Sequence, residues 1–332
     1  MKLGTRGSQL ALWQAHTVAR LVREAGGPAC EIVVVRTSGD EAGTGLGPGG
    51  STLPTTDRAP AAPAAGAAGD SGKSLFVKEL EEALADGRVD FAVHSSKDMP
   101  AVLPDVMALG AVLPREDPRD AIVLPAGAPP ATDAAALAAL LGATPRLGTS
   151  SVRRVAQLRH LFASATFQAI RGNLDTRLRK LDAGDCDAIV LAAAGLRRLG
   201  HGDRVSFAVP ANLCTPAPGQ GIIAVEYLAE RRDVAGVLAR INAPDAADAL
   251  AAERAVVRAL GGGCQMPIGA LAQLDGDTLR IEGVVIAPDA SEVVRHDVSG
   301  PRADARALGD ALAAGLLARG AGAILDAVRR AQ

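Results

Sequence analysis

Short apolar segments and amphipathic segments alternate over the first two-thirds of the chain. Apolar residues recur at helical spacing after Ser8, a residue type that caps helices, and this pattern stops at Gly26 and Gly27. The same spacing predicts helices over residues 75–86, 151–162 and 174–183. Short apolar runs predict strands over residues 31–36, 89–94, 106–113, 121–124, 166–170 and 187–192. Strands separated by helices in this way predict an α/β fold with parallel sheets that are covered on both faces.

The pattern changes near Asn242. An Ala-rich helix is predicted over residues 244–260, and three strands are predicted over residues 268–274, 278–286 and 292–298. Short turns join these strands, which favours an antiparallel meander. A last helical stretch covers about residues 302–331. We therefore expect a separate small α+β domain with a three-stranded antiparallel sheet at the C-terminal end.

Residues 43–72 contain Gly, Pro, Ala and Thr and almost no large apolar side chain. Such a segment cannot bury enough surface to offset the entropy that ordering costs, so we predict a mobile loop inserted into the first domain. Gly45, Gly47 and Gly50 form a GxGxxG pattern in this segment. That pattern indicates dinucleotide binding only where it follows a strand and opens a helix, and here Pro48 interrupts it.

The composition argues against several classes of protein. The 332 residues suffice for two or three domains, and only 2% of them are aromatic, too few for the stacked rings that bind single-stranded nucleic acid. A net charge of −2 also argues against a nucleic-acid partner. No apolar run approaches the roughly 20 residues that span a bilayer, and the N-terminal segment does not resemble a signal peptide. We therefore expect neither a membrane nor a nucleic acid as a partner.

The cysteines are scattered and form no CxxC motif, so the sequence predicts no metal site and a reducing, cytoplasmic compartment. Cys264 differs from the others because three glycines, residues 261–263, precede it. These glycines leave room for a bulky group bound covalently to the thiol, or they form a helix C-cap beside a bystander cysteine. Spacing alone does not decide between these two interpretations.

Basic residues gather between residues 146 and 180, where eight positive charges face one acidic residue, Asp175. Arg153 and Arg154 follow a run of small residues that can open backbone N–H groups at a helix N-terminus to an anion. Arg also offers paired donors that match carboxylates and phosphates. We interpret this pair and Arg171 as anion-binding residues. Three other members are better explained as a solvated helix face: Arg159, Arg179 and Lys180.

A second cluster, His94-Ser95-Ser96-Lys97-Asp98, directly follows a predicted strand. The carboxyl ends of such strands are where α/β folds place their sites. Lys97 offers a cation to an anionic ligand, and Asp98 offers a carboxylate for proton transfer or for stabilising a developing cation. Adjacent Lys-Asp pairs are also common on surfaces, and His94 alone is more often a core histidine than a catalyst. The sequence contains no GxSxG motif, so nothing in it indicates a serine hydrolase.

Taken in order, these clusters and their neighbours resemble the porphobilinogen deaminase (hydroxymethylbilane synthase) family over essentially the whole chain. The resemblance rests on linked motifs that include TRGSQLALWQA at 5–15, KSLFVKELEEAL at 73–84, DFAVHSSKDMP at 90–100 and REDPRDA at 115–121. It continues through LGTSSVRR at 147–154, IRGNLDTRLRKLD at 170–182, AAAGLRRLG, PAPGQGIIAVE and GGGCQMPIGA.

The resemblance implies a transferase of tetrapyrrole biosynthesis. Members of the family condense four porphobilinogen molecules head to tail into hydroxymethylbilane and release ammonia at each step. The chain grows on a dipyrromethane cofactor that a thioether holds to a cysteine, here Cys264. Every pyrrole carries two carboxylates, which gives the basic cluster a purpose.

The same resemblance carries over residue roles. Asp98 matches the catalytic aspartate. Besides Cys264, the positions that match cofactor-binding residues are Ser95, Lys97, Thr149, Ser151, Arg153, Arg154 and Arg171. The positions expected to bind substrate are Arg6, Ser8, Arg177, Arg198 and Gln220.

The family fold implies two similar doubly wound α/β domains, like those of type II periplasmic binding proteins, and a small third domain that bears the cysteine. We expect domain 1 to comprise residues 1–114 and 221–240, domain 2 residues 115–220, and domain 3 residues 241–332, in a monomer. The 43–72 segment is longer than the corresponding family loop and could act as a lid. Two rival functions are a non-catalytic anion-binding protein of similar architecture, which gives Cys264 no task, and a nucleic-acid binder, which the charge opposes.

Overall fold

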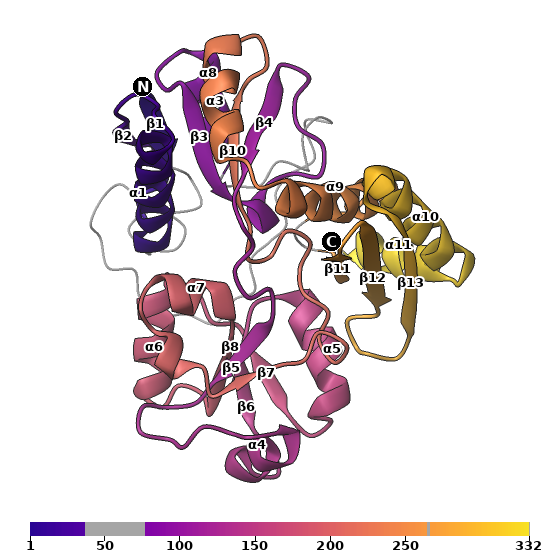
Figure 1. The fold of residues 1–332 in the computed structure, drawn as a ribbon. Coiled ribbons are helices and arrows are strands. Elements are labelled where there is room, and N and C mark those ends of the chain that lie inside the picture. Colours follow the sequence, from indigo (N-terminus) through magenta and orange to yellow (C-terminus); the bar gives the residue numbers. More distant parts are fainter. Residues whose placement is uncertain (37–76, 264–265, 332) are drawn as a thin grey trace, which may run out of the picture.

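The computed structural model describes residues 1–36, 77–263 and 266–331, and these form three units, each built around one sheet (Figure 1). Two of the sheets have five strands and are flanked by helices, and the third has three antiparallel strands. This arrangement confirms the expected fold class. The segment 43–72 and Cys264, for which the sequence predicts a mobile loop and a cofactor attachment point, lie outside the described residues.

The first sheet has the strand order β2-β1-β3-β10-β4. Its strands are β1 (Lys2–Thr5), β2 (Glu31–Val34), β3 (Phe91–Ser95), β4 (Met107–Val112) and β10 (Ile223–Leu228). Its helices are α1 (Gln9–Glu24), α3 (Lys78–Ala85) and α8 (Arg232–Leu238), with the 3₁₀ helices η1 (Ser96–Asp98) and η3 (Ala239–Ile241). Alternate strand residues face opposite sides, so α1 and α8 share one core with Phe91 and Val93, whereas α3 packs with Ala92 on the other face.

The second sheet has the order β7-β6-β8-β5-β9. Its strands are β5 (Asp120–Val123), β6 (Arg146–Gly148), β7 (Thr166–Gln168), β8 (Ala188–Ala192) and β9 (Phe207–Ala208). Its helices are α4 (Ala134–Leu141), α5 (Val152–Leu161), α6 (Leu174–Asp182), α7 (Ala193–Arg198) and η2 (Gly202–Arg204). Leu137 and Leu158 place α4 and α5 in one core, and Leu181 and Leu196 place α6 and α7 in the other.

Both large sheets are mixed, so the expectation of parallel sheets was wrong at two strands, β10 and β5. β10 runs antiparallel to β3 and β4, and β5 runs antiparallel to β8 and β9. The cause is the course of the chain. It leaves the first unit after β4, builds the second unit, and returns through residues 209–222 to add β10 between strands formed more than 100 residues earlier.

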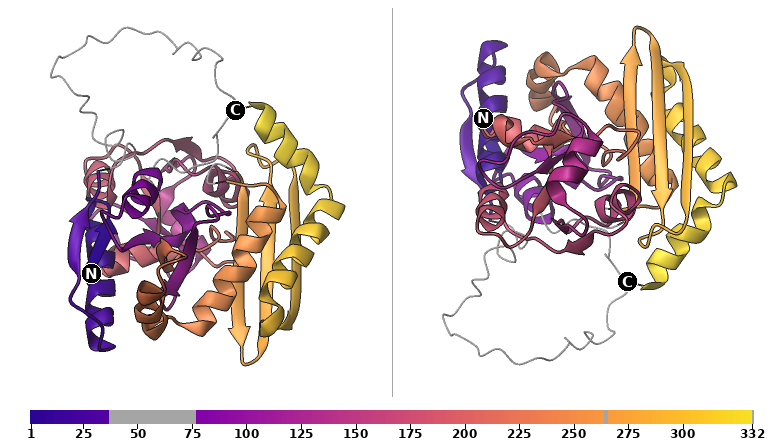
Figure 2. Two further views of the ribbon diagram at one scale, coloured as in Figure 1. Left: turned by 90° about the horizontal axis from the view of Figure 1, so that it is seen from above. Right: turned by 90° about the horizontal axis from the view of Figure 1, so that it is seen from below.

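The third unit contains β11 (Ile268–Asp275), β12 (Thr278–Ile286) and β13 (Val293–Pro301). One face of this sheet forms a core with α9 (Pro244–Ala259), α10 (Ala305–Ala318) and α11 (Ala321–Ala331), and η4 (Arg302–Asp304) precedes α10. The C-terminal helices lie on the outer side of the sheet, away from the two larger units (Figure 2). The opposite face packs through Val284 and Ile286 against Ala156 of α5. The third unit is thus fixed directly to the second.

The helical stretch predicted over residues 302–331 is two helices rather than one. α10, with its preceding turn, and α11 meet at 84°. Gly320 separates them with φ of +102°, a left-handed conformation that glycine adopts readily and that no α-helix continues through. Among the described residues no single helix is long and apolar enough to cross a membrane, and this bent pair meets that criterion only when its two halves are taken together.

Candidate functional site

Two neighbouring parallel strands of the first sheet bring together the N-terminal site residues and those of the second cluster. β1 pairs with β3, so the residues that follow each strand lie at one edge of the sheet. Arg6 and Ser8 follow β1, and the Ser8 hydroxyl caps α1 by accepting a hydrogen bond from the Ala11 amide at 3.3 Å. Ser95 ends β3, and Lys97 and Asp98 follow in η1.

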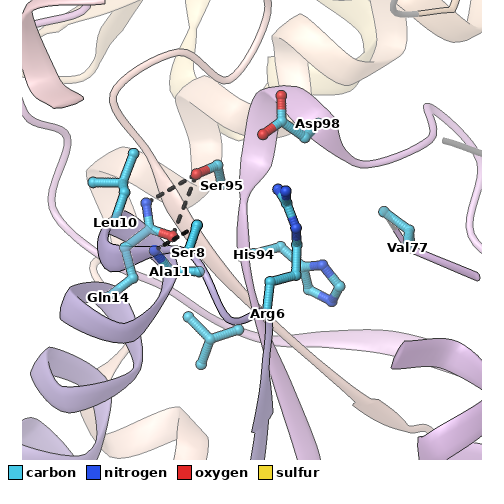
Figure 3. Close-up of a pocket in the computed structure, with 10 residues that line it drawn as sticks. Arg6, Ser8, Leu10, Ala11, Gln14, Val77, His94, Ser95 and Asp98 are labelled. Carbon is cyan, nitrogen blue, oxygen red and sulfur yellow. Dashed lines mark hydrogen bonds between the residues drawn. The ribbon is translucent and has the colours of Figure 1, made fainter. Parts of the chain in front are cut away.

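All of these side chains except that of Lys97 line a pocket of about 70 Å³ (Figure 3). Gln14 of α1 reaches into it, and its side-chain nitrogen donates a hydrogen bond to the Ser95 hydroxyl at 2.9 Å. No local pattern distinguishes Gln14, because it lies within an ordinary amphipathic helix. The predicted site residues that line the pocket are Arg6, Ser8, Ser95 and Asp98.

His94 is buried beside the same pocket. Its Nε2 lies 3.1 Å from Oε2 of Glu226, which is fully buried on the neighbouring strand β10. A histidine held against a carboxylate inside a sheet fits the core interpretation that its position in the sequence favoured.

The second unit supplies the arginine pair. Ser151 caps α5 by accepting a hydrogen bond from the Arg154 amide at 3.4 Å, and the buried Thr149 accepts one from the Ser151 amide at 3.3 Å. Arg153 and Arg154 therefore lie in the first turn of α5, at its positive end. Both side chains are buried, with exposed fractions of 4% and 7%.

Both guanidinium groups converge on Asp120, a fully buried residue at the start of β5. Arg153 Nη1 donates to Asp120 Oδ2 at 2.7 Å, and Arg154 Nε donates to Oδ1 at 2.9 Å, while Arg154 Nη2 forms an ion pair with Oδ1 at 2.8 Å. Gln220 Nε2 donates to the same Oδ1 at 2.9 Å, and the Cys214 thiol lies 3.4 Å from Oδ2. Although burial alone would raise it, the two arginines hold the pKa of Asp120 far below its usual range.

Asp120 is the functional candidate that the sequence reasoning missed. It lies within the REDPRDA motif, where several charges stand close together and no spacing rule distinguishes one of them. Its carboxylate also affects its surroundings. Burial first and the Asp120 charge second raise the pKa of the Cys214 thiol to about 12, so this cysteine stays protonated near neutral pH.

Electrostatic coupling joins the two halves of the site. Burial lowers the pKa of Lys97 to about 8, while the adjacent Asp98 carboxylate opposes this shift and Arg154 of the other unit adds to it. Burial and Arg154 also lower the pKa of Arg177, and Asp98 again opposes the shift. The groups from both units therefore share one region, in which the cations outnumber the carboxylates.

Arg198 connects the second unit to the first. Its Nη2 donates a hydrogen bond to the Gly221 carbonyl at 2.6 Å, and its guanidinium carbon lies 5.9 Å from the centre of the Trp13 ring on α1. Burial lowers its pKa to about 10. Arg171 is exposed beside Gly172, whose carbonyl accepts a hydrogen bond from Arg177 Nε at 2.8 Å.

The remaining basic residues of the 146–180 segment lie outside this region. Arg146 forms an ion pair with Asp187 at 2.8 Å, and Arg159 is exposed, with its guanidinium carbon 5.7 Å from the centre of the Phe167 ring. No group of three or more His, Cys, Asp or Glu that could hold a metal ion occurs within the described ranges.

The loop that carries Cys264 is described only at its two ends. Gly261 follows α9 with φ of +61°, and Arg329 of α11 donates hydrogen bonds to the carbonyls of Leu260 and Gly261 at 2.8 Å and 3.2 Å. Beyond Cys264, the Met266 amide donates to the Gly263 carbonyl at 3.0 Å. Gly261 thus lies at the C-terminal end of α9, which fits the interpretation of the three glycines as a helix C-cap.

Family models match most of the chain. Residues 1–236 match the model described as "Porphobilinogen deaminase, dipyromethane cofactor binding domain", and residues 247–318 match "Porphobilinogen deaminase, C-terminal domain". Among solved structures, the immunogenic lipoprotein A of Vibrio vulnificus is 11% identical, with a TM-score of 0.40 over 73% of this chain and 94% of that chain.

Curated relatives named porphobilinogen deaminase match along nearly their whole length. The protein of Moorella thermoacetica is 44% identical over 330 residues, which cover 99% of this chain and 96% of the relative. The protein of Chromobacterium violaceum is 43% identical over 98% of this chain and 97% of the relative, and that of Methylobacillus flagellatus is 44% identical over 98% and 96%. The chain therefore belongs to the porphobilinogen deaminase family.

Proposed function

We propose that this chain condenses four porphobilinogen molecules head to tail into hydroxymethylbilane and releases one ammonia at each coupling, using a dipyrromethane primer held to Cys264 by a thioether. Membership of the family supports the reaction. The observation that supports the assignment of the site is the position of Lys97 and Asp98, which directly follow β3 and lie within electrostatic range of groups of the second unit, Arg154 and Arg177.

The described residues fit a dipyrromethane group. Two linked pyrroles carry four carboxylates and two ring N–H donors, so they need several cations and at least one carboxylate acceptor. The residues that we propose to hold the cofactor offer hydroxyls, an ammonium and guanidinium groups: Ser95, Lys97, Thr149, Ser151, Arg153, Arg154 and Arg171. When bound, the cofactor supplies the ring carbon to which the first substrate ring is joined.

Asp98 is the residue that we propose to act in catalysis. In each coupling the C–N bond of the porphobilinogen aminomethyl group breaks, the nitrogen leaves as ammonia, and positive charge develops on the substrate ring. A fixed carboxylate stabilises that charge and accepts a hydrogen bond from the ring N–H. The new C–C bond forms with loss of one proton, which balances the proton that the leaving amine requires, and the Asp98 carboxylate can carry it.

The incoming substrate carries an acetate and a propionate group that need cationic partners of their own. We propose that Arg6 and Ser8 of the first unit and Arg177 and Arg198 of the second bind them, together with Gln220. Arg198 supports this role because it touches both the returning chain at Gly221 and the α1 helix of the first unit. Residues from both units would then grip one substrate.

We further propose three domains: residues 1–114 with 221–240, residues 115–220, and residues 241–332. The separate sheets and cores support this division. We also propose that the chain acts as a monomer in the cytoplasm. The free thiols of Cys30, Cys186 and Cys214 support a reducing compartment.

The reaction is tested by incubating the purified protein with porphobilinogen and measuring ammonia and tetrapyrrole in the same sample. We expect four ammonia molecules for each hydroxymethylbilane released. Binding of porphobilinogen with no ammonia would instead indicate an anion-binding protein and contradict the proposal.

A further inference from the structure

Thr215, which lies between β9 and β10, is held by two of the three units at once. It is fully buried. Its amide donates a hydrogen bond to Gln157 Oε1 at 2.8 Å, and its carbonyl accepts from Gln157 Nε2 at 3.0 Å, so α5 of the second unit fixes its backbone. Its hydroxyl accepts a hydrogen bond from Arg295 Nη1 of β13 at 2.9 Å, so the third unit fixes its side chain.

Arg295 reaches the second unit from the sheet face that packs on α5. It is the register partner of Val284, which packs with Ile286 against Ala156. Its second terminal nitrogen, Nη2, donates to Gln157 Oε1 at 3.4 Å, so one guanidinium bonds both Thr215 and the side chain that holds Thr215. This fork cannot be reproduced by a single ammonium group.

The third unit holds the rest of the returning segment as well. The Ala270 amide of β11 donates to the Pro216 carbonyl at 3.0 Å, and the Gly219 amide donates to the buried carboxylate of Glu253 on α9 at 2.6 Å. A Cβ atom placed on Gly269 would lie 2.7 Å from the Thr215 carbonyl oxygen, which shows how closely the β11 backbone approaches it. The position of the third unit thus sets the position of residues 215–219.

The same segment contacts the anchoring arginine. Arg153 Nη1 donates to the Thr215 carbonyl at 2.7 Å and to Asp120 at 2.7 Å. One end of this hydrogen-bonded chain is therefore an exposed arginine on the third unit, and the other end is a guanidinium that we assign to carboxylate binding. A shift of Thr215 would move one of the two acceptors that orient Arg153.

We infer that Arg295 is a positioning residue that transmits the placement of the third unit to Arg153 through Thr215 and Gln157. The inference rests on the proposed anchoring role of Arg153. The contribution of Arg295 is to fix the direction in which Arg153 presents its remaining donors. Because we assign Arg153 to the cofactor, loss of that direction weakens carboxylate binding while the two pyrroles are being attached. It therefore slows cofactor assembly more than it slows turnover by protein that already carries the cofactor.

The test compares Arg295→Met with a control, Arg280→Met. Arg280 is an exposed arginine on the neighbouring strand β12, and it forms an ion pair with Asp297 at 3.3 Å. We expect Arg295→Met to lower the rate at which cofactor-free protein gains two pyrroles, followed by intact mass, roughly 2- to 30-fold, the span of couplings carried by packed networks. The rate of porphobilinogen turnover by protein that already carries the cofactor should be nearly unchanged. Its thermal midpoint should stay within about 4 °C of the wild type, and Arg280→Met should leave both rates unchanged.

A second variant, Thr215→Val, removes the hydroxyl acceptor and preserves the side-chain shape. If Arg295 acts through Thr215, the double variant should slow cofactor assembly no further than the larger of the single changes. Multiplying effects would overturn the route through Thr215, and a wild-type assembly rate in Arg295→Met would overturn the inference as a whole. A wild-type protein that gains no pyrroles at all would instead defeat the anchoring role on which the inference rests.

Discussion

Replacing Asp120 with Asn tests whether one buried carboxylate holds the two anchoring arginines. The side chain is fully buried, accepts hydrogen bonds from Arg153 at 2.7 Å and from Arg154 Nε at 2.9 Å, and forms an ion pair with Arg154 Nη2 at 2.8 Å. Asn keeps nearly the same volume but removes the charge and turns one acceptor into a donor. That donor would face a guanidinium, so the change leaves two buried cations without their nearest anion.

The magnitude follows from burial. Removing one partner of a buried ion pair typically costs about 3–5 kcal/mol, because the other charge remains desolvated. Asp120 faces two such partners and also accepts from Gln220 at 2.9 Å, so we expect a loss of at least about 3 kcal/mol in the free energy of unfolding. That is a large share of the ~5–15 kcal/mol by which typical proteins are stable.

The dependence of this loss on pH has a definite sign. The folded pKa of Asp120 lies below its unfolded value of about 3.9, so its contribution is complete above that pH and is lost as the pH falls through the folded pKa. The difference in unfolding free energy between wild type and Asp120→Asn should therefore be constant from about pH 5 to pH 8. It should shrink below about pH 4.

Urea unfolding over this pH range measures the effect, and Asp182→Asn is the matched control in the same unit. Asp182 pairs with Arg204 at 2.7 Å, but both side chains are partly exposed, so its removal should cost about 1 kcal/mol or less. A loss for Asp120→Asn no larger than that of the control would refute the reasoning. So would a difference that grows as the pH falls.

Three further predictions concern the reaction and the cofactor. Asp98→Asn should fold normally and lose about 10²- to 10³-fold in porphobilinogen turnover, as expected for one electrostatic stabiliser, and near-normal turnover would exclude Asp98 as the catalytic group. Cofactor assembly should slow as the pH passes about 8, where Lys97 loses its proton, and Lys97→Arg should abolish that loss of rate because its guanidinium stays charged; an identical loss in both proteins would show that another group titrates. Changing Cys30, Cys186 or Cys214 to Ser should preserve the pyrrole colour with an acidic aldehyde reagent, and loss of colour in any of them would place the attachment point elsewhere.

Local signals in the sequence identified many elements because their causes are local. Ser8 caps α1 as predicted, since a cap depends only on residues within one turn. The strand predicted over residues 278–286 coincides with β12, because alternating burial along one strand leaves a direct trace in the sequence. Helices α5 and α9 likewise begin and end within a residue or two of their predicted bounds.

Pairings between distant segments were not predictable in this way. β10 was not identified as a strand, and its pairing with β3 joins Ala224 to His94, two residues that no local pattern connects. β9 has only two residues, too few for any periodicity. The break between α10 and α11 was also missed, because apolar residues continue at helical spacing on both sides of Gly320.

For the site, the sequence identified the residue types but not their partners. Arg153 and Arg154 were predicted to bind an anion from their place at a helix N-terminus, and the structure adds that an internal anion, Asp120, already takes several of their donors. Gln220 was selected as a substrate-binding residue, and its side-chain nitrogen in fact donates to Asp120 and to the Pro118 carbonyl. Such contacts link positions about 30 to 100 residues apart, so only the folded chain reveals them.

The central claim is that the chain carries a covalent dipyrromethane on Cys264, and the intact mass of the purified protein tests it most directly. The polypeptide itself accounts for 33.6 kDa. We predict that the wild-type protein is heavier by the mass of two linked pyrroles, and that Cys264→Ser, whose hydroxyl is a poorer nucleophile than a thiol, has the mass of the polypeptide alone. A wild-type protein with only the polypeptide mass, or a Cys264→Ser protein that keeps the added mass, would contradict the account.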